Sequence, residues 1–237
     1  MKIILSGIKK TVGKLGYEIH RTESALWKTP LYSLYTYLRA DGSFDYERYK
    51  QKQIEGNNHK ADKVWVIEEN IAFLSRYIDR FEGPTRRGLC HGTRKGMEQV
   101  WFKKYLNIDV IGTEISDTAY RIPDTLQWDF HEVKPEWIGA IDFIYSNSFD
   151  HSYDPEKCLN AWMRCLRKGG LCILEHSSGH EASAVNELDP FGADLVFMPY
   201  LVLNWGKGEY GVRELIEAPK KGKNVRYLFF IVIQKWM

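Results

Sequence analysis

Apolar side chains recur at a helical spacing between residues 67 and 81 and predict the strongest helix of the chain. The intervals are four, three, four and three residues, formed by Ile67, Ile71, Leu74, Ile78 and Phe81. Positions three and four apart lie on one face of a helix, so these side chains form a single apolar stripe. The Gly83-Pro84 pair that follows predicts the end of the helix.

Short apolar runs alternate with helical patterns in the next part of the chain. Runs of strand length cover residues 88–91, 109–113, 126–129, 141–146 and 171–175. Helical patterns and turns lie between several of them, at 96–105, at 117–121, and from the Asp154-Pro155 pair to Lys168-Gly169-Gly170. This alternation is typical of a parallel sheet with helices on its faces.

The C-terminal part of the chain follows a different pattern. A polar loop at 176–193 and a helix near 198–205 precede two strand-like runs, at 212–216 and 225–235. A short turn joins these two runs. They therefore predict an antiparallel hairpin at the edge of the sheet.

The first 60 residues also depart from the α/β alternation. They carry many aromatic side chains, a helical pattern around 44–54 and a polar stretch at 55–60. We therefore expect an N-terminal extension over residues 1–60 beside a sheet-containing domain over residues 61–237.

A glycine-rich turn separates the first predicted strand from its helix. Residues 88–96 read Gly-Leu-Cys-His-Gly-Thr-Arg-Lys-Gly, and the second strand ends in Glu114, 22 residues after Gly92. Glycines let the backbone approach a ligand, and an acid at the end of the next strand accepts hydrogen bonds from ribose hydroxyls. The arrangement predicts a nucleoside site.

The order of these elements resembles the class I S-adenosylmethionine-dependent methyltransferases over roughly residues 85–237. Three further segments carry the resemblance: Trp128-Asp-Phe130, Asp142-Phe-Ile-Tyr-Ser-Asn147 and Leu166-Arg-Lys-Gly-Gly-Leu171. The resemblance implies a Rossmann-like α/β fold with a mostly parallel seven-stranded sheet. It also implies a C-terminal antiparallel hairpin and an N-terminal helical extension.

S-adenosylmethionine is therefore the expected cofactor, and the family motifs imply its contacts. The acid after the second strand would bind the ribose, and the acid after the third strand would lie near the adenine amine. The residues carried over to this chain are His91, Gly92, Thr93, Arg94, Gly96, Glu114, Ile115, Asp129, Phe130, Ser146 and Asn147.

The first motif departs from the family pattern at its methionine end. The family usually has an Asp or Glu at the start of this motif and a GxGxG run. Here the glycines stand at 88, 92 and 96, and His91 occupies a usual glycine position. Arg94 is then a candidate to meet the carboxylate of the ligand.

Five of the seven histidines follow predicted strands, whose carboxyl ends form the ligand crevice of an open parallel sheet. A hydroxyl acceptor needs a base, and histidine titrates near neutrality. We identify His151 as the candidate base, Asp150 as its neighbouring carboxylate and His176 as a second catalytic candidate. His176, His180, Asp150 and Asp189 could together hold a metal ion. Their spacing matches no named metal motif, so we predict no metal site.

The composition limits the binding partners and the cellular compartment that we expect for this protein. The net charge of +2 lacks the strong basic excess of nucleic-acid-binding proteins. The four cysteines form no CxxC pair, which indicates reduced thiols in a cytoplasmic protein rather than a zinc ribbon. No apolar run approaches the roughly 18 residues that span a membrane, so we expect no integral membrane segment.

We therefore expect methyl transfer from S-adenosylmethionine to a small-molecule or saccharide acceptor, at a hydroxyl, by in-line displacement. The aromatic N-terminal extension would form part of the acceptor pocket. Residues 8–20 also resemble the leaders of methyltransferases encoded with bacterial surface-polysaccharide enzymes, which points to polysaccharide biosynthesis.

Three alternatives stay open at the level of the sequence. The first alternative is a nucleic-acid methyltransferase. Amino-methylating DNA enzymes typically carry an Asn/Asp-Pro-Pro-aromatic run, whereas this chain has Ser146-Asn-Ser-Phe149, without prolines. A non-catalytic S-adenosylmethionine-binding protein would keep the fold and Glu114. A dinucleotide oxidoreductase is disfavoured by the glycine spacing and the terminal hairpin.

Overall fold

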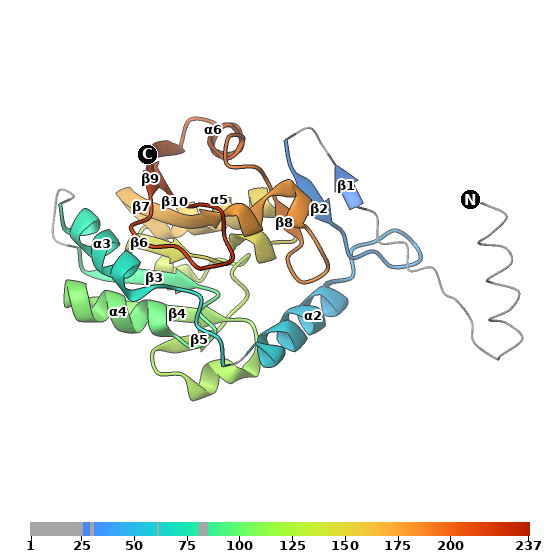
Figure 1. Ribbon diagram of the computed structural model, residues 1–237, viewed down its shortest axis with the longest axis horizontal. Coiled ribbons are helices and arrows are strands. Elements are labelled where there is room, and N and C mark those ends of the chain that lie inside the picture. Colours follow the sequence, from blue (N-terminus) through green and yellow to red (C-terminus); the bar gives the residue numbers. More distant parts are fainter. Residues whose placement is uncertain (1–25, 29–30, 61, 81–84) are drawn as a thin grey trace, which may run out of the picture.

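The computed structural model describes residues 26–28, 31–60, 62–80 and 85–237. These residues form a seven-stranded sheet with the order β5-β4-β3-β6-β7-β10-β9 and a three-stranded sheet with the order β1-β2-β8. Figure 1 shows the large sheet between helices, with the small sheet and α2 at one side of it.

The large sheet has the predicted architecture. Its strands are β3 (Arg87–His91), β4 (Asp109–Glu114), β5 (Thr125–Gln127), β6 (Ile141–Ser146), β7 (Leu166–Ser177), β9 (Tyr210–Glu217) and β10 (Leu228–Lys235). Strands β3 to β7 pair in parallel, and β10 pairs antiparallel with both β7 and β9. The expected Rossmann-like sheet with its antiparallel C-terminal hairpin is therefore confirmed.

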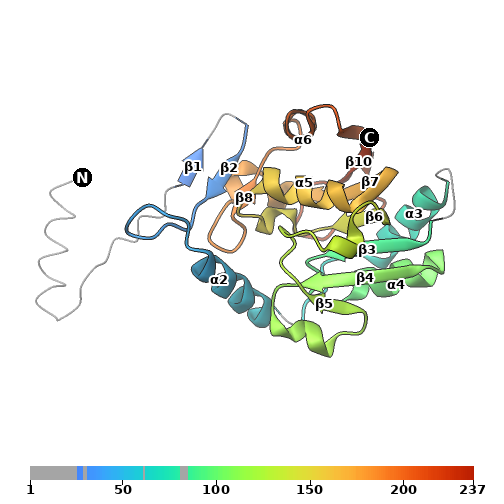
Figure 2. The ribbon, with the colours of Figure 1, turned by 180° about the vertical axis from the view of Figure 1, so that it is seen from behind.

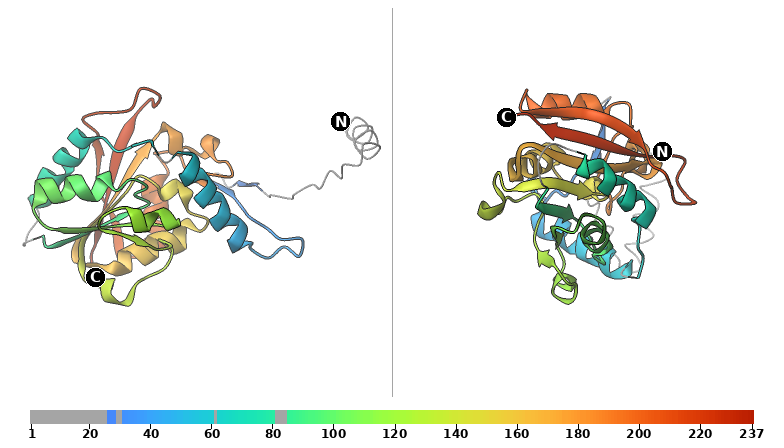
Figure 3. Two further views of the ribbon diagram at one scale, coloured as in Figure 1. Left: turned by 90° about the horizontal axis from the view of Figure 1, so that it is seen from below. Right: turned by 90° about the vertical axis from the view of Figure 1, so that its left-hand side faces the viewer.

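Helices cover both faces of the large sheet (Figures 2 and 3). They are α3 (Glu68–Asp79), α4 (Met97–Leu106), α5 (Pro155–Cys165) and α6 (Met198–Gly206), while α2 (Tyr46–His59) lies beside the sheet. Phe143 and Tyr145 pack with the buried side chains of α3 and α4. Ile144 packs in the other layer, with α5 and α6. Because side chains alternate along a strand, the continuous apolar run of β6 reflects cover on both faces.

The strongest predicted helix is α3. Ile71, Leu74 and Ile78 are buried as expected, and Ile67 stands directly before the first turn. Phe81, the Gly83-Pro84 pair and the 8–20 pattern lie outside the described residues. Within the described residues, no helix is long and apolar enough to cross a membrane.

Two helix ends differ from the sequence prediction. Helix α2 continues to His59 instead of ending near residue 54, because polar side chains of its last turns are buried by hydrogen bonds to other segments. Helix α5 ends at Cys165, and the glycines predicted to cap it lie inside β7. There Gly169 has a φ of 78°, next to an irregularity in the pairing of β6 and β7.

The sequence pattern does not predict the small sheet. Its strands are β1 (Leu26–Lys28), β2 (Ser33–Tyr35) and β8 (Phe191–Gly192). Strands of two or three residues are too short to show an alternation of apolar and polar positions. The pairing of β2 with β8 places a strand in the predicted polar loop and joins the N-terminal segment to the chain after β7.

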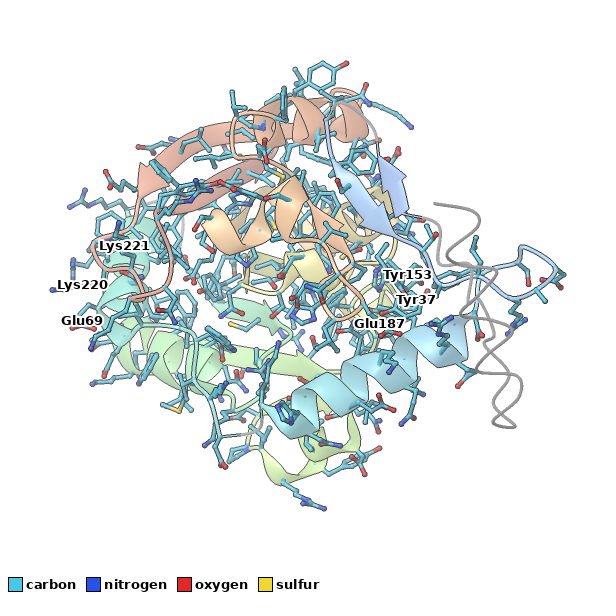
Figure 4. All side chains as sticks on the ribbon, turned by 45° about the vertical axis from the view of Figure 1, so that its right-hand side comes forward. Tyr37, Glu69, Tyr153, Glu187, Lys220 and Lys221 are labelled. Atoms are coloured by element: carbon cyan, nitrogen blue, oxygen red, sulfur yellow. The ribbon has the colours of Figure 1, made fainter. Side chains whose placement is uncertain are left out.

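Helix α2 lies at the edge of the large sheet where the parallel strands end. Tyr49 is 1% exposed and donates its hydroxyl to the His151 carbonyl at 3.1 Å. Its ring centroid lies 4.7 Å from that of Tyr153. Tyr37 donates its hydroxyl to the carbonyl of Glu187. Figure 4 shows Tyr37, Tyr153 and Glu187 together beside α2, so Tyr49 anchors the helix to one loop and Tyr37 anchors the segment before the helix to another.

Candidate active site

A cavity of about 590 Å³ lies between α2 and the carboxyl ends of β3, β4 and β5. We call it the first cavity. Its walls include Glu114, Ile115, Asp129 and Phe130. Four residues of the predicted nucleoside site are thus brought together, although they come from two separate segments of the chain.

The glycine turn after β3 is pressed against the end of β6. Gly92 has a φ of 73°, and a β-carbon there would lie 2.6 Å from the β-carbon of Ser148. The backbone N–H groups of Gly92 and Thr93 both donate to the carbonyl of Thr113 at 3.0 Å. Gly96, with a φ of 72°, stands immediately before α4. Only glycine meets both the left-handed conformation and the close approach at residue 92.

Glu114 ends β4 with its carboxylate in the first cavity. The residue is 6% exposed, and the backbone N–H of Ser116 donates to its Oε1 at 3.0 Å. Burial raises the pKa of this carboxyl, while the backbone N–H of Ser116 and the Arg94 guanidinium act in the opposite direction. Glu114 is thus a buried hydrogen-bond acceptor at a strand end, facing the first cavity.

Asp129 sits beyond the end of β5 and is held by three hydrogen bonds. Its Oδ1 accepts from the backbone N–H of His131 at 2.9 Å and from the ring Nδ1 of the same histidine at 2.7 Å. Its Oδ2 accepts from the Tyr46 hydroxyl at 2.7 Å. Burial acts to raise the pKa of Asp129, yet its hydrogen bonds to His131 keep that pKa below its usual range. The carboxylate is therefore fixed and charged at the cavity wall.

A Ser-His-Asp chain runs behind this carboxylate. Nε2 of His131 lies 2.8 Å from Oγ of Ser152, and its Nδ1 meets Asp129. Ser152 is fully buried, so its hydroxyl is not a nucleophile for an external substrate. These three hydrogen-bonded side chains instead connect the end of β5 to the segment after β6.

A second cavity of about 1260 Å³ adjoins the first. Gly92, Arg94, Ser148 and His151 line both cavities, so the two spaces meet at these residues. Arg94 is held there by a hydrogen bond of 3.0 Å from its Nε to Oδ1 of Asn57 on α2. The second cavity is rich in carboxyl groups, contributed by Glu98, Asp150, Glu175 and Asp189.

Burial alters the protonation of three of these carboxyls. It raises the pKa of Glu98 to about 8, that of Glu175 to about 7 and that of Asp150 to about 6. Each of the three residues is at most 9% exposed. The second cavity is therefore lined by three carboxyl groups that change charge near neutral pH.

His151 has one ring nitrogen fixed and the other directed at a carboxylate. Its Nδ1 lies 2.7 Å from Oε1 of Gln53, whose Nε2 donates to the Leu188 carbonyl at 3.0 Å. That second bond orients the Gln53 amide, so Nδ1 of His151 carries the hydrogen and Nε2 keeps its lone pair. Nε2 lies 3.7 Å from Oδ1 of Asp189. This is the tautomer that a general base needs.

The four residues considered for a metal ion are not all close together. Among the described residues, Asp150, His151 and Asp189 lie close enough to share a metal ion, with ligand atoms within 4.8 Å of one another. His180 accepts the backbone N–H of Ser177 on its Nδ1, and its Nε2 lies 3.6 Å from Oδ2 of Asp150. His176 is separate from this group.

Three of the predicted site residues turn away from both cavities. The His91 ring stacks on Trp162 with centroids 4.6 Å apart, and burial lowers its pKa to about 3. Ser146 donates its hydroxyl to the carbonyl of His91 at 3.0 Å. His176 lines a small separate cavity beside Phe191, and burial lowers its pKa to about 3. All three side chains lie on the α5 side of their strands.

Sequence reasoning missed several residues that line the cavities. Tyr49, Gln53 and Asn57 of α2 recur every four residues and face the first cavity. Their spacing is a helical stripe, but a polar one, which a search for apolar periodicity overlooks. Ser148 follows directly after the predicted Asn147. Trp128, which precedes the predicted Asp129, also lines the first cavity.

We expect Gly92→Ala to destabilise the protein more than Gly139→Ala. Both glycines have a left-handed φ, of 73° and 66°, but a β-carbon at Gly139 meets open space. The backbone strain is therefore matched, and the contact with Ser148 should cost a further 1 kcal/mol or more, on the order of an overpacked core site. Urea unfolding of both variants measures the difference, and equal losses would show that the turn can move away from Ser148.

We expect Glu98→Gln to gain stability over the wild type as the pH rises. Burial raises the pKa of Glu98 from 4.5 to about 8. The contribution of Glu98 to stability is therefore fully present below pH 4.5 and is lost as the pH rises through 8. The gain between about pH 5 and pH 8 should reach roughly 1.4 kcal/mol or more, equivalent to one pKa unit. The free energy of unfolding of both proteins tests this, and a difference that does not vary with pH would contradict it.

Comparisons with known proteins agree with this geometry. Residues 89–174 match the model of the methyltransferase domain family. This segment runs from β3 to β7 and includes the glycine turn, Glu114 and Asp129. No curated protein matches the chain.

Solved structures of methyltransferases share the fold. The 1,6-didemethyltoxoflavin-N1-methyltransferase of Burkholderia thailandensis, with bound 1,6-didemethyltoxoflavin and S-adenosylhomocysteine, is 12% identical with a TM-score of 0.61, covering 89% of this chain and 98% of that one. A plantazolicin methyltransferase, in complex with a triazolic desmethyl analogue and S-adenosylhomocysteine, is 11% identical with a TM-score of 0.59, covering 81% and 98%. A putative sarcosine dimethylglycine methyltransferase from Galdieria sulphuraria is 13% identical with a TM-score of 0.54, covering 71% and 85%.

At these identities the likeness concerns the fold. The enzyme class and the cofactor expected from the sequence agree with both kinds of comparison. Residues 89–174 thus match the methyltransferase domain family, and the fold of the chain is the one that these solved methyltransferases share.

Proposed function

We propose that this protein transfers a methyl group from S-adenosylmethionine to a hydroxyl of a small molecule, with saccharides as the acceptor class. The observation that carries the proposal is the meeting of two cavities at His151. The first cavity offers buried carboxylates to a nucleoside. The second is larger and lined by polar groups. A donor with its adenosine in the first cavity would extend into the second and face an acceptor there, beside this histidine.

The first cavity fits the adenosine part of the donor. Glu114 presents a buried carboxylate that can accept hydrogen bonds from two ribose hydroxyls. Asp129 and Phe130 lie at the end of the next strand, where an adenine amine and ring would follow. Gly92 lets the remainder of the donor pass close to the backbone, toward Thr93 and Asn147 in the second cavity.

The transfer needs an aligned acceptor and a base. S-adenosylmethionine supplies an electrophilic methyl group on a sulfonium sulfur. The second cavity must hold the acceptor oxygen opposite that sulfur, so that the oxygen–carbon bond forms as the carbon–sulfur bond breaks. Nε2 of His151 takes the hydroxyl proton. The carboxylate of Asp189, at 3.7 Å, stabilises the imidazolium that results, and Asp150 adds negative charge to the same cavity.

We further propose that residues 1–60 belong to the acceptor side and residues 61–237 form the catalytic domain. The position of α2 supports this division, because the helix contributes Gln53, the residue that orients His151. A cytoplasmic enzyme is supported by its four cysteines, which are buried and free. A saccharide acceptor would suit a role in polysaccharide biosynthesis.

The donor site is tested by calorimetric titration with S-adenosylhomocysteine. We expect micromolar binding to the wild-type protein and a loss of tenfold or more in Glu114→Ala, because a buried charged acceptor for two hydroxyls is worth about 1.5–3 kcal/mol. Glu217→Ala, at the end of the edge strand β9, is the control for removing a carboxylate at a strand end. NAD serves as the competing ligand, and binding of NAD in place of S-adenosylhomocysteine would move the protein to the oxidoreductases.

The base is tested by methyl transfer from labelled S-adenosylmethionine to a panel of nucleotide sugars and free hexoses. We expect His151→Ala to lower kcat by about 10²–10⁴-fold with each accepted sugar, the usual contribution of a general base. Binding of S-adenosylhomocysteine should stay within about twofold. His59→Ala, in the last turn of α2, is the matched control. Full activity of His151→Ala would exclude this residue as the base.

A further inference from the structure

Two buried carboxyl groups line the second cavity. Glu98 comes from the first turn of α4 and is 7% exposed, and Glu175 comes from the end of β7 and is 9% exposed. The Asn147 side chain hydrogen-bonds Glu98, and the Tyr145 hydroxyl donates to Oε2 of Glu175 at 2.7 Å. Within the described part of the chain, neither carboxylate forms an ion pair.

Such a pair is costly for a folded protein unless a ligand uses it. Buried carboxylates are normally matched by a cation or by several hydrogen bonds, since desolvation opposes the charged form. Here desolvation and the neighbouring Glu175 raise the pKa of Glu98, and the opposing effects of the Arg94 guanidinium and the Asn147 side chain do not offset them. Both carboxyls nevertheless face a cavity rather than the packed core. A bound cation would restore the charge balance that the chain itself leaves unmet.

The position of Glu98 relative to the first cavity indicates which cation this is. Gly92 and Arg94 line both cavities, while Thr93, Asn147 and Glu98 line only the second. The segment 88–96 contains no carboxylate, so Glu98 is the first acid along the chain after β3. A ligand with its ribose at Glu114 would therefore reach Glu98 with its opposite end.

We propose that Glu98 binds the α-ammonium group of the donor's methionine moiety, with Glu175 adding negative charge behind it. This inference rests on the proposed function, because that donor carries an ammonium and a carboxylate at the end opposite its adenosine. Arg94, at the junction of the cavities, is placed to meet the carboxylate. The zwitterion is thus recognised by one base in the glycine turn, Arg94, and one acid in the first turn of α4, Glu98.

The test compares three probes: S-adenosylhomocysteine, its decarboxylated analogue, and 5′-methylthioadenosine. The first has both charged groups, the second keeps only the amine, and the third has neither. We expect Glu98→Gln to weaken the first two by about 10- to 100-fold, the range for a lost charge-assisted hydrogen bond. Binding of 5′-methylthioadenosine should stay within twofold. Glu69→Gln on α3, labelled in Figure 4, is the exposed control and should change none of the three.

The outcomes separate this inference from the proposed function. If the wild type binds neither S-adenosylhomocysteine nor 5′-methylthioadenosine, the proposed function fails. If the wild type binds both and Glu98→Gln weakens both equally or neither, Glu98 does not hold the ammonium. Glu98→Asp provides a second variant that keeps the charge. It should retain part of the preference for the amine-bearing probes, and a complete loss of that preference would contradict a charge-based contact.

Discussion

The close contact between the turn after β3 and the end of β6 is the constraint on which the site depends. Gly92 approaches Ser148 so closely that no side chain fits, and Ser148 in turn donates its hydroxyl to the Gly92 carbonyl at 3.2 Å. On the other side, the N–H groups of the turn are taken by Thr113 of β4. Three strands are thereby locked at their carboxyl ends. The two cavities meet at this contact, so its geometry determines where a donor would face an acceptor.

The cover over this edge is made of polar contacts. Helix α2 contributes Gln53 to the orientation of His151 and Asn57 to the position of Arg94. Asn57 also donates to Oγ of Ser116 at 2.7 Å. Each of these bonds satisfies a group that would otherwise be buried alone, which is why the helix stays ordered along its polar end. The same contacts fix the tautomer of His151 and the position of the Arg94 guanidinium, so α2 shapes the site as well as covering it.

The electrostatics of the site follow from burial. The histidines directed into the core, His91 and His176, are kept neutral by desolvation. The carboxyls of Glu98 and Glu175 in the second cavity are also driven toward their neutral forms. His151 differs because its ring stands at the junction of the cavities, with a carboxylate at one nitrogen and an amide at the other. Of these three histidines, it is the one whose contacts suit proton transfer.

The sequence alone determined the elements whose signals are local. Helical spacing identified α3, continuous apolar runs identified β6, and the glycine turn and Glu114 were placed correctly at the ends of β3 and β4, beside one cavity. These predictions work because periodicity and turn chemistry depend on neighbouring residues. The acid that ends β4 needs no long-range information, since a strand end in a parallel sheet faces the ligand edge.

Only the tertiary structure decided the direction and partners of the side chains. Side chains alternate along a strand, so His176 turned to the core while Glu175 turned to the cavity, although both follow the same apolar run. The contact of His151 with Asp189 joins residues far apart in the chain. The polar stripe of α2 gained its meaning only when the helix lay over the sheet edge. Register and long-range packing are collective properties, and no local pattern encodes them.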